Sequence, residues 1–251
     1  MRTKLFLFLS ILFMAFALPQ KKKIKIFIAG DSTAANKEVK AFPETGWGMP
    51  FATLFDSTVT VDNRAKNGRS TKSFISEGLW QKLIDDVNEG DYVFIQFGHN
   101  DESKEKTDRY TTPEEYKSNL GRFITETRNK KATPVLLTPV SRRQFDSAGQ
   151  VRETHKEYSP LVKEVAKQYN VAFIDMDEKS RELLQKFGPE NSKLLFMQLE
   201  PGEHPNYPDG RNDNTHFNEL GARKMAQLVL YGIKDLKLEL ADRIRPPLQT
   251  K

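Results

Sequence analysis

The sequence predicts an α/β fold in which helices cover both faces of a parallel sheet. Short apolar runs alternate along the chain with longer amphipathic segments, and each run is nearly continuous. Continuous apolar runs are typical of strands that are buried on both faces, as in a parallel sheet. The 251 residues are enough for one domain with a full core, and the sequence shows no internal repeat and no inter-domain linker.

Five segments fit the strands of this sheet. They are residues 24–28, 59–61, 91–97, 134–138 and 171–175. The first is followed by Gly30, Asp31, Ser32 and Thr33, where we expect a tight turn and a helix that begins near Ser32 or Thr33. Ligands bind at the carboxyl ends of parallel strands, so this turn lies at the edge that matters for function.

The segments between the strands carry apolar residues at helical spacing. One helix is expected from Thr71 to Val87, and another begins at Thr112, where a capping threonine precedes proline and two glutamates. Further helices are expected after Pro50, across residues 158–166 and 177–187, and after Asn218. Residues 188–213 resemble a long loop, and the Pro-rich tail from Arg243 is expected to be loose.

The N-terminus fits a secretory signal peptide. Arg2 and Lys4 precede an apolar stretch at residues 5–18, and Ala15 and Ala17 form a small-x-small cleavage site. A transmembrane span needs about 20 residues, so we expect cleavage after Ala17 rather than an uncleaved anchor. The predicted organisation is a signal peptide at 1–17, a linker at 18–23, the domain at 24–240 and a tail at 241–251. The mature protein is then periplasmic or secreted and does not contact the membrane.

Composition excludes several kinds of protein. The chain has no cysteine, which rules out disulfides, thiol catalysis and lipoprotein attachment. Cleavage removes two basic residues from 39 Lys and Arg, against 34 Asp and Glu, and leaves a net charge of about +3. This charge is slight and is not gathered into a basic patch with aromatics, so we expect no nucleic-acid partner.

Four polar clusters end four elements of the predicted fold. They are Gly30-Asp31-Ser32, Gly68-Arg69-Ser70, Gly98-His99-Asn100-Asp101 and Asp213-Asn214-Thr215-His216. In a right-handed doubly wound sheet the corresponding loops all emerge at one edge. The clusters are therefore expected to meet although they are far apart in sequence.

Together these clusters supply what acyl transfer through a serine requires. Ser32 offers the nucleophile, His216 can accept its proton, and Asp213 can orient the imidazole. The backbone N–H groups of Ser32 and Gly68 and the side-chain amide of Asn100 are candidate oxyanion donors. The alternative for the first cluster is that Asp31, Ser32 and Thr33 only cap a helix.

The same four clusters, in this order, resemble the SGNH hydrolases, also called the GDSL esterase/lipase superfamily. The named residues of that family correspond to Ser32, Gly68, Asn100 and His216, and the resemblance spans residues 24–233. It implies a flavodoxin-like three-layer α/β/α sandwich with a central five-stranded parallel sheet. It also implies a Ser-His-Asp triad without metal or cofactor.

Within the superfamily the clusters look like the rhamnogalacturonan acetylesterase branch, which removes acetyl groups from pectic polysaccharide. The segments concerned are Gly30-Asp31-Ser32-Thr33, Gly68-Arg69-Ser70-Thr71 and Gln96-Phe97-Gly98-His99-Asn100-Asp101. Threonine replaces the leucine that usually follows the serine, which disfavours a lipase. The resemblance implies a carbohydrate O-acetylesterase with an acetylated polysaccharide or oligosaccharide as its substrate, and we expect a monomer.

Other interpretations remain open from the residues alone. Arg69, His99 and Arg142 are candidate substrate-binding residues, although the arginines, with Arg143, could equally be solvated loop charges. His99 and Asp101 could instead ligate a metal with Asp31, which we do not expect.

Two further histidines have less claim to a role. His155 is expected to face solvent on a charged helix, and His204 to lie in a loop with Asp209. Trp47 either stacks on a sugar ring or packs its loop. The competing function classes are an esterase for another glycan such as xylan, a lipid or short-chain esterase of the same fold, and a sugar-binding module without catalysis.

Overall fold

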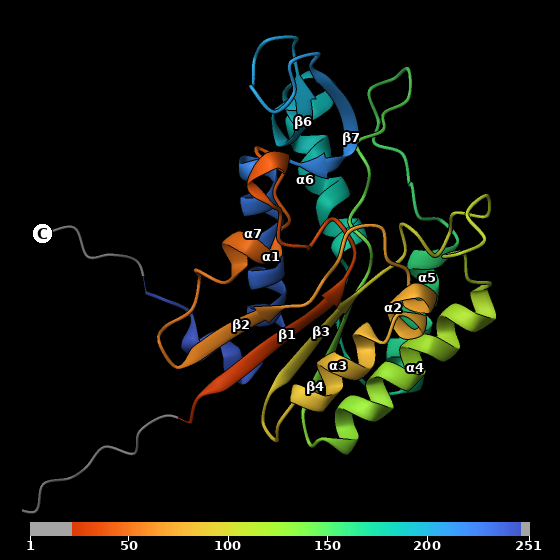
Figure 1. Ribbon diagram of the computed structural model, residues 1–251, viewed down its shortest axis with the longest axis vertical. Helices are drawn as coiled ribbons and strands as arrows, with labels where there is room; N and C mark the ends of the chain where they lie inside the picture. The colour runs from red at the N-terminus through yellow and green to blue at the C-terminus, as the bar shows by residue number, and fades with distance from the viewer. Residues whose placement is uncertain (1–21, 247–251) are drawn as a thin grey trace, which may run out of the picture.

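The computed structural model describes residues 22–246, so the predicted signal peptide and the end of the tail lie outside the described residues. A central sheet of five parallel strands runs through the molecule (Figure 1). The strands are β1 (Ile24–Gly30), β2 (Val59–Asn63), β3 (Tyr92–Gln96), β4 (Thr133–Leu137) and β5 (Ala172–Ile174). Their order across the sheet is β2-β1-β3-β4-β5, which is the flavodoxin-like arrangement. The strands are added on one side of β1 and then, from β3 onward, on the other side, so the switch point of the topology lies between β1 and β3.

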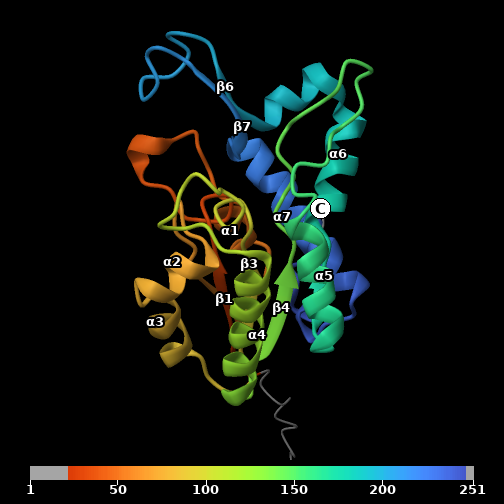
Figure 2. The same ribbon diagram turned by 90° about the vertical axis from the view of Figure 1, so that its right-hand side faces the viewer.

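Helices cover both faces of this sheet (Figures 1 and 2). Alternate side chains of β1 point to opposite faces, so Ile26 and Ile28 join one core and Phe27 and Ala29 the other. The first core is closed by α1 (Gly48–Phe51), α6 (Met176–Asn191) and α7 (Glu219–Asp235). The second is closed by α2 (Thr71–Ser76), α3 (Leu79–Asp86), α4 (Pro113–Asn129) and α5 (Tyr158–Gln168). The predicted α/β/α sandwich is confirmed.

The predicted start of α4 is also confirmed. The Thr112 hydroxyl accepts a hydrogen bond from the Glu115 N–H at 3.2 Å, and the Glu115 carboxylate accepts one from the Thr112 N–H at 2.8 Å. This reciprocal capping satisfies two N–H groups that have no acceptor within the helix.

The helix expected at Ser32 does not form. Residues 32–35 make a turn, because the Asp31 carboxylate accepts hydrogen bonds from the N–H and the hydroxyl of Thr33, at 2.9 and 2.7 Å. Such local side-chain bonds compete with helical ones. The single helix expected over residues 71–87 is likewise divided into α2 and α3 at Gly78, whose φ of +69° is left-handed.

The long loop expected at 188–213 contains regular structure. Helix α6 continues through a kink at Gly188, and a 3₁₀ turn, η2 (Ser192–Leu195), leads into β6 (Phe196–Leu199). This strand pairs antiparallel with β7 (Arg211–Phe217), which precedes α7. The prediction of a loop was wrong because β7 is polar along most of its length and carries no strand pattern.

The start of the predicted loose tail packs on the body. A last 3₁₀ turn, η3 (Glu239–Arg243), ends in a buried arginine. Arg243 donates hydrogen bonds to the Lys22 carbonyl and the Thr58 hydroxyl, both at 2.9 Å. None of the helices between residues 22 and 246 has the length and apolar character that crossing a membrane requires.

Candidate active site

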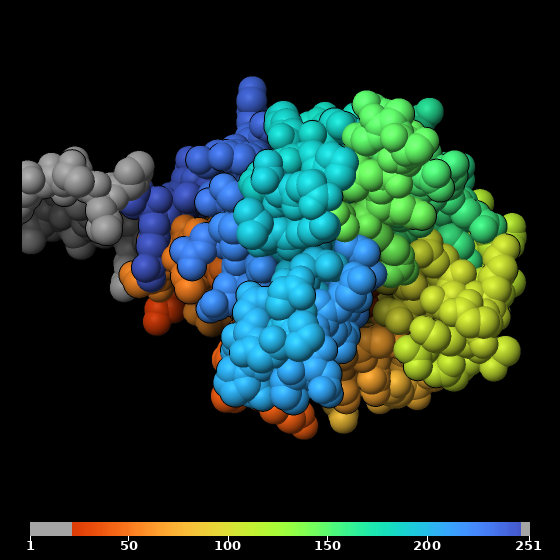
Figure 3. Space-filling model, turned by 90° about the horizontal axis from the view of Figure 1, so that it is seen from above, coloured from red at the N-terminus to blue at the C-terminus, as the bar shows by residue number. Residues whose placement is uncertain are grey.

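The four polar clusters meet at the carboxyl edge of the sheet. Ser32 follows β1, Gly68 lies in the loop after β2, and Asn100 lies in the loop after β3. The β6–β7 hairpin, which carries Asp213 and His216, stands over this edge (Figure 1). Seen from above, the light-blue hairpin lies in front of the rest of the molecule, and the yellow-green loop that follows β3 lies to its right (Figure 3).

Ser32, His216 and Asp213 form a continuous hydrogen-bonded chain. His216 Nε2 lies 2.9 Å from Ser32 Oγ, and His216 Nδ1 lies 2.8 Å from Asp213 Oδ2. The other oxygen of Asp213 accepts the N–H groups of Thr215 and His216, at 2.8 and 3.0 Å. The backbone that follows Asp213 thus holds the carboxylate in place while the carboxylate orients the imidazole of His216. With Nδ1 donating to Asp213, Nε2 is free to accept the hydroxyl proton of Ser32.

An irregularity in β7 makes this contact possible. Met197 pairs with Asp213 and Phe196 pairs with Phe217, so residues 214–216 bulge out of the ladder. In a regular strand, residues three apart lie about 10 Å from each other and point to opposite faces. The bulge therefore brings the side chains of Asp213 and His216 together.

The surroundings of Asp213 favour its charged form. Burial disfavours ionisation, but the hydrogen bonds and charge of His216, together with Arg211 at 2.9 Å, hold the pKa of this carboxyl well below its usual range. Asp213 therefore carries a negative charge at neutral pH, as an orienting group for a histidine base requires.

The three predicted oxyanion donors lie in the loops that follow β1, β2 and β3. Among the described residues, neither the Ser32 nor the Gly68 backbone N–H has a hydrogen-bond acceptor. Gly68 adopts a left-handed φ of +74°, which suits glycine. The Asn100 amide donates one N–H to the Arg69 carbonyl at 3.0 Å, and its second N–H remains for a ligand. Their role in stabilising an oxyanion stays a prediction.

Lys37 is a residue that the sequence analysis missed. It is buried, and its ammonium group contacts three acceptors: the Ser32 carbonyl at 2.7 Å, Asn67 Oδ1 at 2.8 Å and Glu44 Oε1 at 2.7 Å. It ties the serine turn to the loop that carries Gly68. Nothing in the sequence distinguishes it from the exposed lysines nearby, because its partners come from three separate segments.

Asp31 and Asp101, considered as metal ligands, each use one carboxyl oxygen, Oδ1, in hydrogen bonds, and the Oδ2 of each is buried without a hydrogen-bond partner among the described residues. Asp101 accepts bonds from the N–H and hydroxyl of Thr71 and from the Thr111 hydroxyl, at 2.6–2.9 Å. Burial nevertheless raises the pKa of Asp101 to about 7, and it also raises that of Asp31. Within residues 22–246, no group of three or more Asp, Glu or His side chains is arranged to hold a metal ion.

His155 is buried, so the prediction that it faces solvent was wrong. Nδ1 lies 3.0 Å from Glu102 Oε2, and Nε2 lies 3.0 Å from the Val140 carbonyl. The charged residues around His155 in the sequence gave no sign of this, because Glu102 comes from a distant loop.

Arg142, one of the candidate substrate-binding residues, makes hydrogen bonds to other side chains of the protein. It donates to Glu102 Oε1 at 3.2 Å and to the Thr215 hydroxyl at 3.0 Å, and so supports the bulge in β7. His99 is buried and packs edge-on against His155, with ring centres 4.4 Å apart. Burial lowers the pKa of His99 well below its usual value, so its ring is neutral.

Arg69 lies beside Gly68 and remains partly exposed. Its guanidinium pairs with Glu77 at 2.8 Å and donates to the Asn67 carbonyl at 2.8 Å. Substrate binding by Arg69, His99 and Arg142 stays a prediction.

Trp47 is buried and donates a hydrogen bond to Gln96 Oε1 at 2.7 Å, so it packs its loop rather than presenting a stacking surface. His204 lies in the loop between β6 and β7, as expected.

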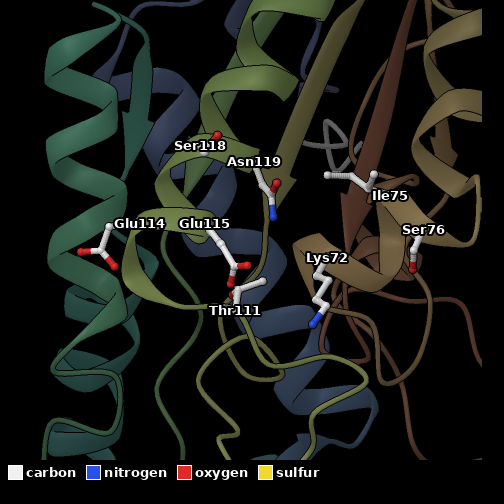
Figure 4. A pocket seen from close by; sticks show the side chains of 8 residues that line it. All are labelled: Lys72, Ile75, Ser76, Thr111, Glu114, Glu115, Ser118 and Asn119. Atoms are coloured by element: carbon white, nitrogen blue, oxygen red, sulfur yellow. The ribbon is translucent and has the colours of Figure 1, made fainter.

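Two pockets differ in their relation to the triad. A pocket of about 380 Å³ lies between the loops after β1 and β2, beside Gly68. Another of about 510 Å³ lies between α2 and α4 (Figure 4), and no triad residue lines it. Among its lining residues, Asn119 donates to Thr71, which in turn donates to the buried Asp101.

Comparisons with known proteins agree with this geometry. The model of the GDSL-like Lipase/Acylhydrolase family matches residues 28–224. The chain is 45% identical over 224 residues to rhamnogalacturonan acetylesterase RhgT of Bacillus subtilis, which covers 89% of this chain and 95% of that protein. It is 38% identical over 220 residues to the probable rhamnogalacturonan acetylesterase YesY of the same organism, covering 87% and 96%.

Solved structures share the fold at low sequence identity. Bacillus subtilis YxiM superposes with a TM-score of 0.75 at 24% identity, over 87% of this chain and 58% of that one. A mutant of Axe2, an acetyl-xylooligosaccharide esterase from Geobacillus, superposes with a TM-score of 0.61 at 19% identity, over 84% and 94%. The family match covers most of the sheet and all four polar clusters. The chain therefore belongs to the GDSL-like lipase/acylhydrolase family, as its polar clusters predict.

Proposed function

We propose that this protein is a serine esterase that removes O-acetyl groups from pectic polysaccharide of the rhamnogalacturonan type. The observation that carries the proposal is the hydrogen-bonded chain from Ser32 through His216 to Asp213, in a sequence 45% identical to a rhamnogalacturonan acetylesterase. The acetyl-xylooligosaccharide esterase is only 19% identical and shares the fold alone, so the pectic substrate is favoured over xylan.

The reaction proceeds through an acetyl-enzyme. Ser32 Oγ attacks the carbonyl carbon of the acetyl ester while His216 Nε2 accepts the hydroxyl proton. The N–H groups of Ser32, Gly68 and Asn100 stabilise the negative oxygen that forms. His216 then donates its proton to the departing sugar oxygen as the ester bond breaks. A water molecule then attacks the acetyl-serine while His216 accepts one of its protons, and His216 passes that proton to Ser32 Oγ as acetate leaves.

The protein acts outside the cytoplasm after cleavage following Ala17, as a monomer and without a cofactor. The basic start at Arg2 and Lys4, the apolar stretch at residues 5–18 and the small residues at its end support export. The absence of cysteine is compatible with export, because a core of this size needs no disulfides.

Acetate release from two polymers tests the function. The substrates are acetylated rhamnogalacturonan and acetylated xylan, each with and without EDTA, and the proteins are wild type, Ser32→Ala and the control Ser118→Ala on α4. We expect release from the pectic polymer that is lost in Ser32→Ala, kept in Ser118→Ala and indifferent to EDTA. Acetate release from xylan alone would contradict the proposal of a pectic substrate. Acetate release by Ser32→Ala would contradict the proposal that Ser32 is the nucleophile.

A further inference from the structure

The pocket beside Gly68 is built from two loops at the carboxyl edge of the sheet. The loop after β1 and the loop after β2 each contribute to its wall. Its lining residues are Ala35, Asn36, Glu38, Lys40, Ala41, Ala65, Lys66, Asn67 and Arg69. Asn67 and Arg69 are the sequence neighbours of Gly68, whose backbone N–H is a predicted oxyanion donor. The wall of the pocket therefore lies next to that N–H group. A group bound in this pocket belongs to the part of the substrate next to the reacting ester.

The pocket carries an excess of positive charge. Lys40, Lys66 and Arg69 face a single lining acid, Glu38, which pairs with Lys40 at 2.8 Å. Arg69 pairs with Glu77 outside the lining. Lys66 is exposed, and its ammonium group has no hydrogen bond or ion pair with any described residue. It is therefore the cation that is available to a ligand.

The position of Asn67 relative to the serine turn is fixed by Lys37. Buried Lys37 donates to the Ser32 carbonyl and to Asn67 Oδ1, at 2.7 and 2.8 Å. Because Asn67 Oδ1 is used as an acceptor, both N–H groups of its amide can donate to a ligand. The distance between the serine turn and the pocket is thus set before any substrate binds, which lowers the entropic cost of binding.

We propose that this pocket binds the carboxylate of a uronic acid residue of the polymer close to the acetyl ester, with Lys66 and Asn67 as donors and Arg69 adding charge. The inference rests on the proposed function and specifies what the enzyme recognises in its polymer. A carboxylate matches cationic and amide donors through charge-assisted hydrogen bonds. A neutral glycan offers hydroxyl groups but no negative charge to these cations, and a lipid chain offers neither.

The test compares two forms of one substrate. Acetylated rhamnogalacturonan oligosaccharides are used with free uronates or with the uronates methyl-esterified, and kcat/KM for acetate release is measured on both. Wild type prefers the free acid. Lys66→Met lowers this preference about 2- to 5-fold, as expected for an exposed ion pair, mainly through KM. Lys163→Met, an exposed lysine on α5, removes the same charge and retains the wild-type preference.

The ratio distinguishes recognition from damage to the fold. A variant that is merely destabilised loses activity on both forms, so its preference stays that of wild type. An unchanged preference in Lys66→Met, with wild type active on the free acid, would overturn the uronate pocket and leave the esterase function standing. Absence of wild-type activity on both forms would overturn the proposed function itself.

Discussion

Asn100 uses one N–H of its amide to fix its own position and has a second one to donate. The first bonds to the Arg69 carbonyl at 3.0 Å. If the second stabilises the oxyanion, Asn100→Ala lowers kcat about 10²–10³-fold, as loss of such a donor does in another serine hydrolase. Steady-state kinetics check this, because KM stays close to that of wild type. Asn88→Ala, at an exposed asparagine, is the control, and a near-normal kcat in Asn100→Ala would contradict the role.

Asp101 links pH to the stability of the fold. Its pKa is raised by burial to about 7, against about 3.9 for an ordinary aspartate. Between these values the folded protein retains a proton that the unfolded chain has lost. Stability therefore falls as pH rises through this window, by up to about 1.4 kcal/mol per pH unit from this group.

Asp101→Asn removes this dependence because an amide does not titrate. Urea unfolding of both proteins across the window measures it. As pH rises, the unfolding free energy of wild type should fall relative to that of Asp101→Asn. Asp31 and His99 titrate in both proteins, so the difference reports Asp101, and a difference that is constant with pH would refute the assignment.

At the scale of elements, the bulge of β7 is held by neighbouring loops. Arg143 donates its backbone N–H to the Asn214 carbonyl and its side chain to Asn214 Oδ1, both at 2.8 Å, and also bonds Ser192 at 3.0 Å. Small misplacements of catalytic groups cost up to about 100-fold in rate. Arg143→Met should therefore lower kcat at least about 10-fold on a small acetate ester.

The matched control for Arg143 is Arg152→Met, since the Arg152 side chain is exposed. The two variants are compared by kcat, KM and thermal midpoint. A fall in thermal midpoint for Arg143→Met without any change in kcat would show that the contact serves stability and does not position His216.

The elements that could be predicted are those whose signal is local. The apolar run of β3 and the capping residues of α4 specify their own structure within a few positions. The turn at Ser32 and the strand β7 could not be predicted in this way. Asp31 replaces helical bonds by its own side-chain bonds, and β7 is held by pairing with β6 and by distant arginines.

The candidate site follows the same division. Ser32, His216 and Asp213 could be brought together from two of the four polar clusters, because a parallel sheet gathers strand ends at one edge. Lys37 and His155 could not, because both are defined by burial and by partners from remote loops. Charged residues of this kind resemble surface residues in the sequence and differ from them only in the folded protein.

For the whole molecule, export is the prediction that lies outside the described residues. Expression of the full chain in a host with a general secretory pathway should release a protein whose sequence begins at Leu18. N-terminal sequencing of the exported fraction measures this. A protein that begins at Met1 and stays with the membrane would support the uncleaved anchor.

The central claim is that Ser32 carries the acetyl group during the reaction. The most direct test is to mix the enzyme with an activated acetate ester, quench with acid during the first turnover, and locate acetylation by peptide mass spectrometry. We expect an acetyl group on the peptide that contains Ser32, and we expect it to be absent in Ser32→Ala. Acetate release at the wild-type rate by Ser32→Ala, or acetylation at another residue, would contradict it.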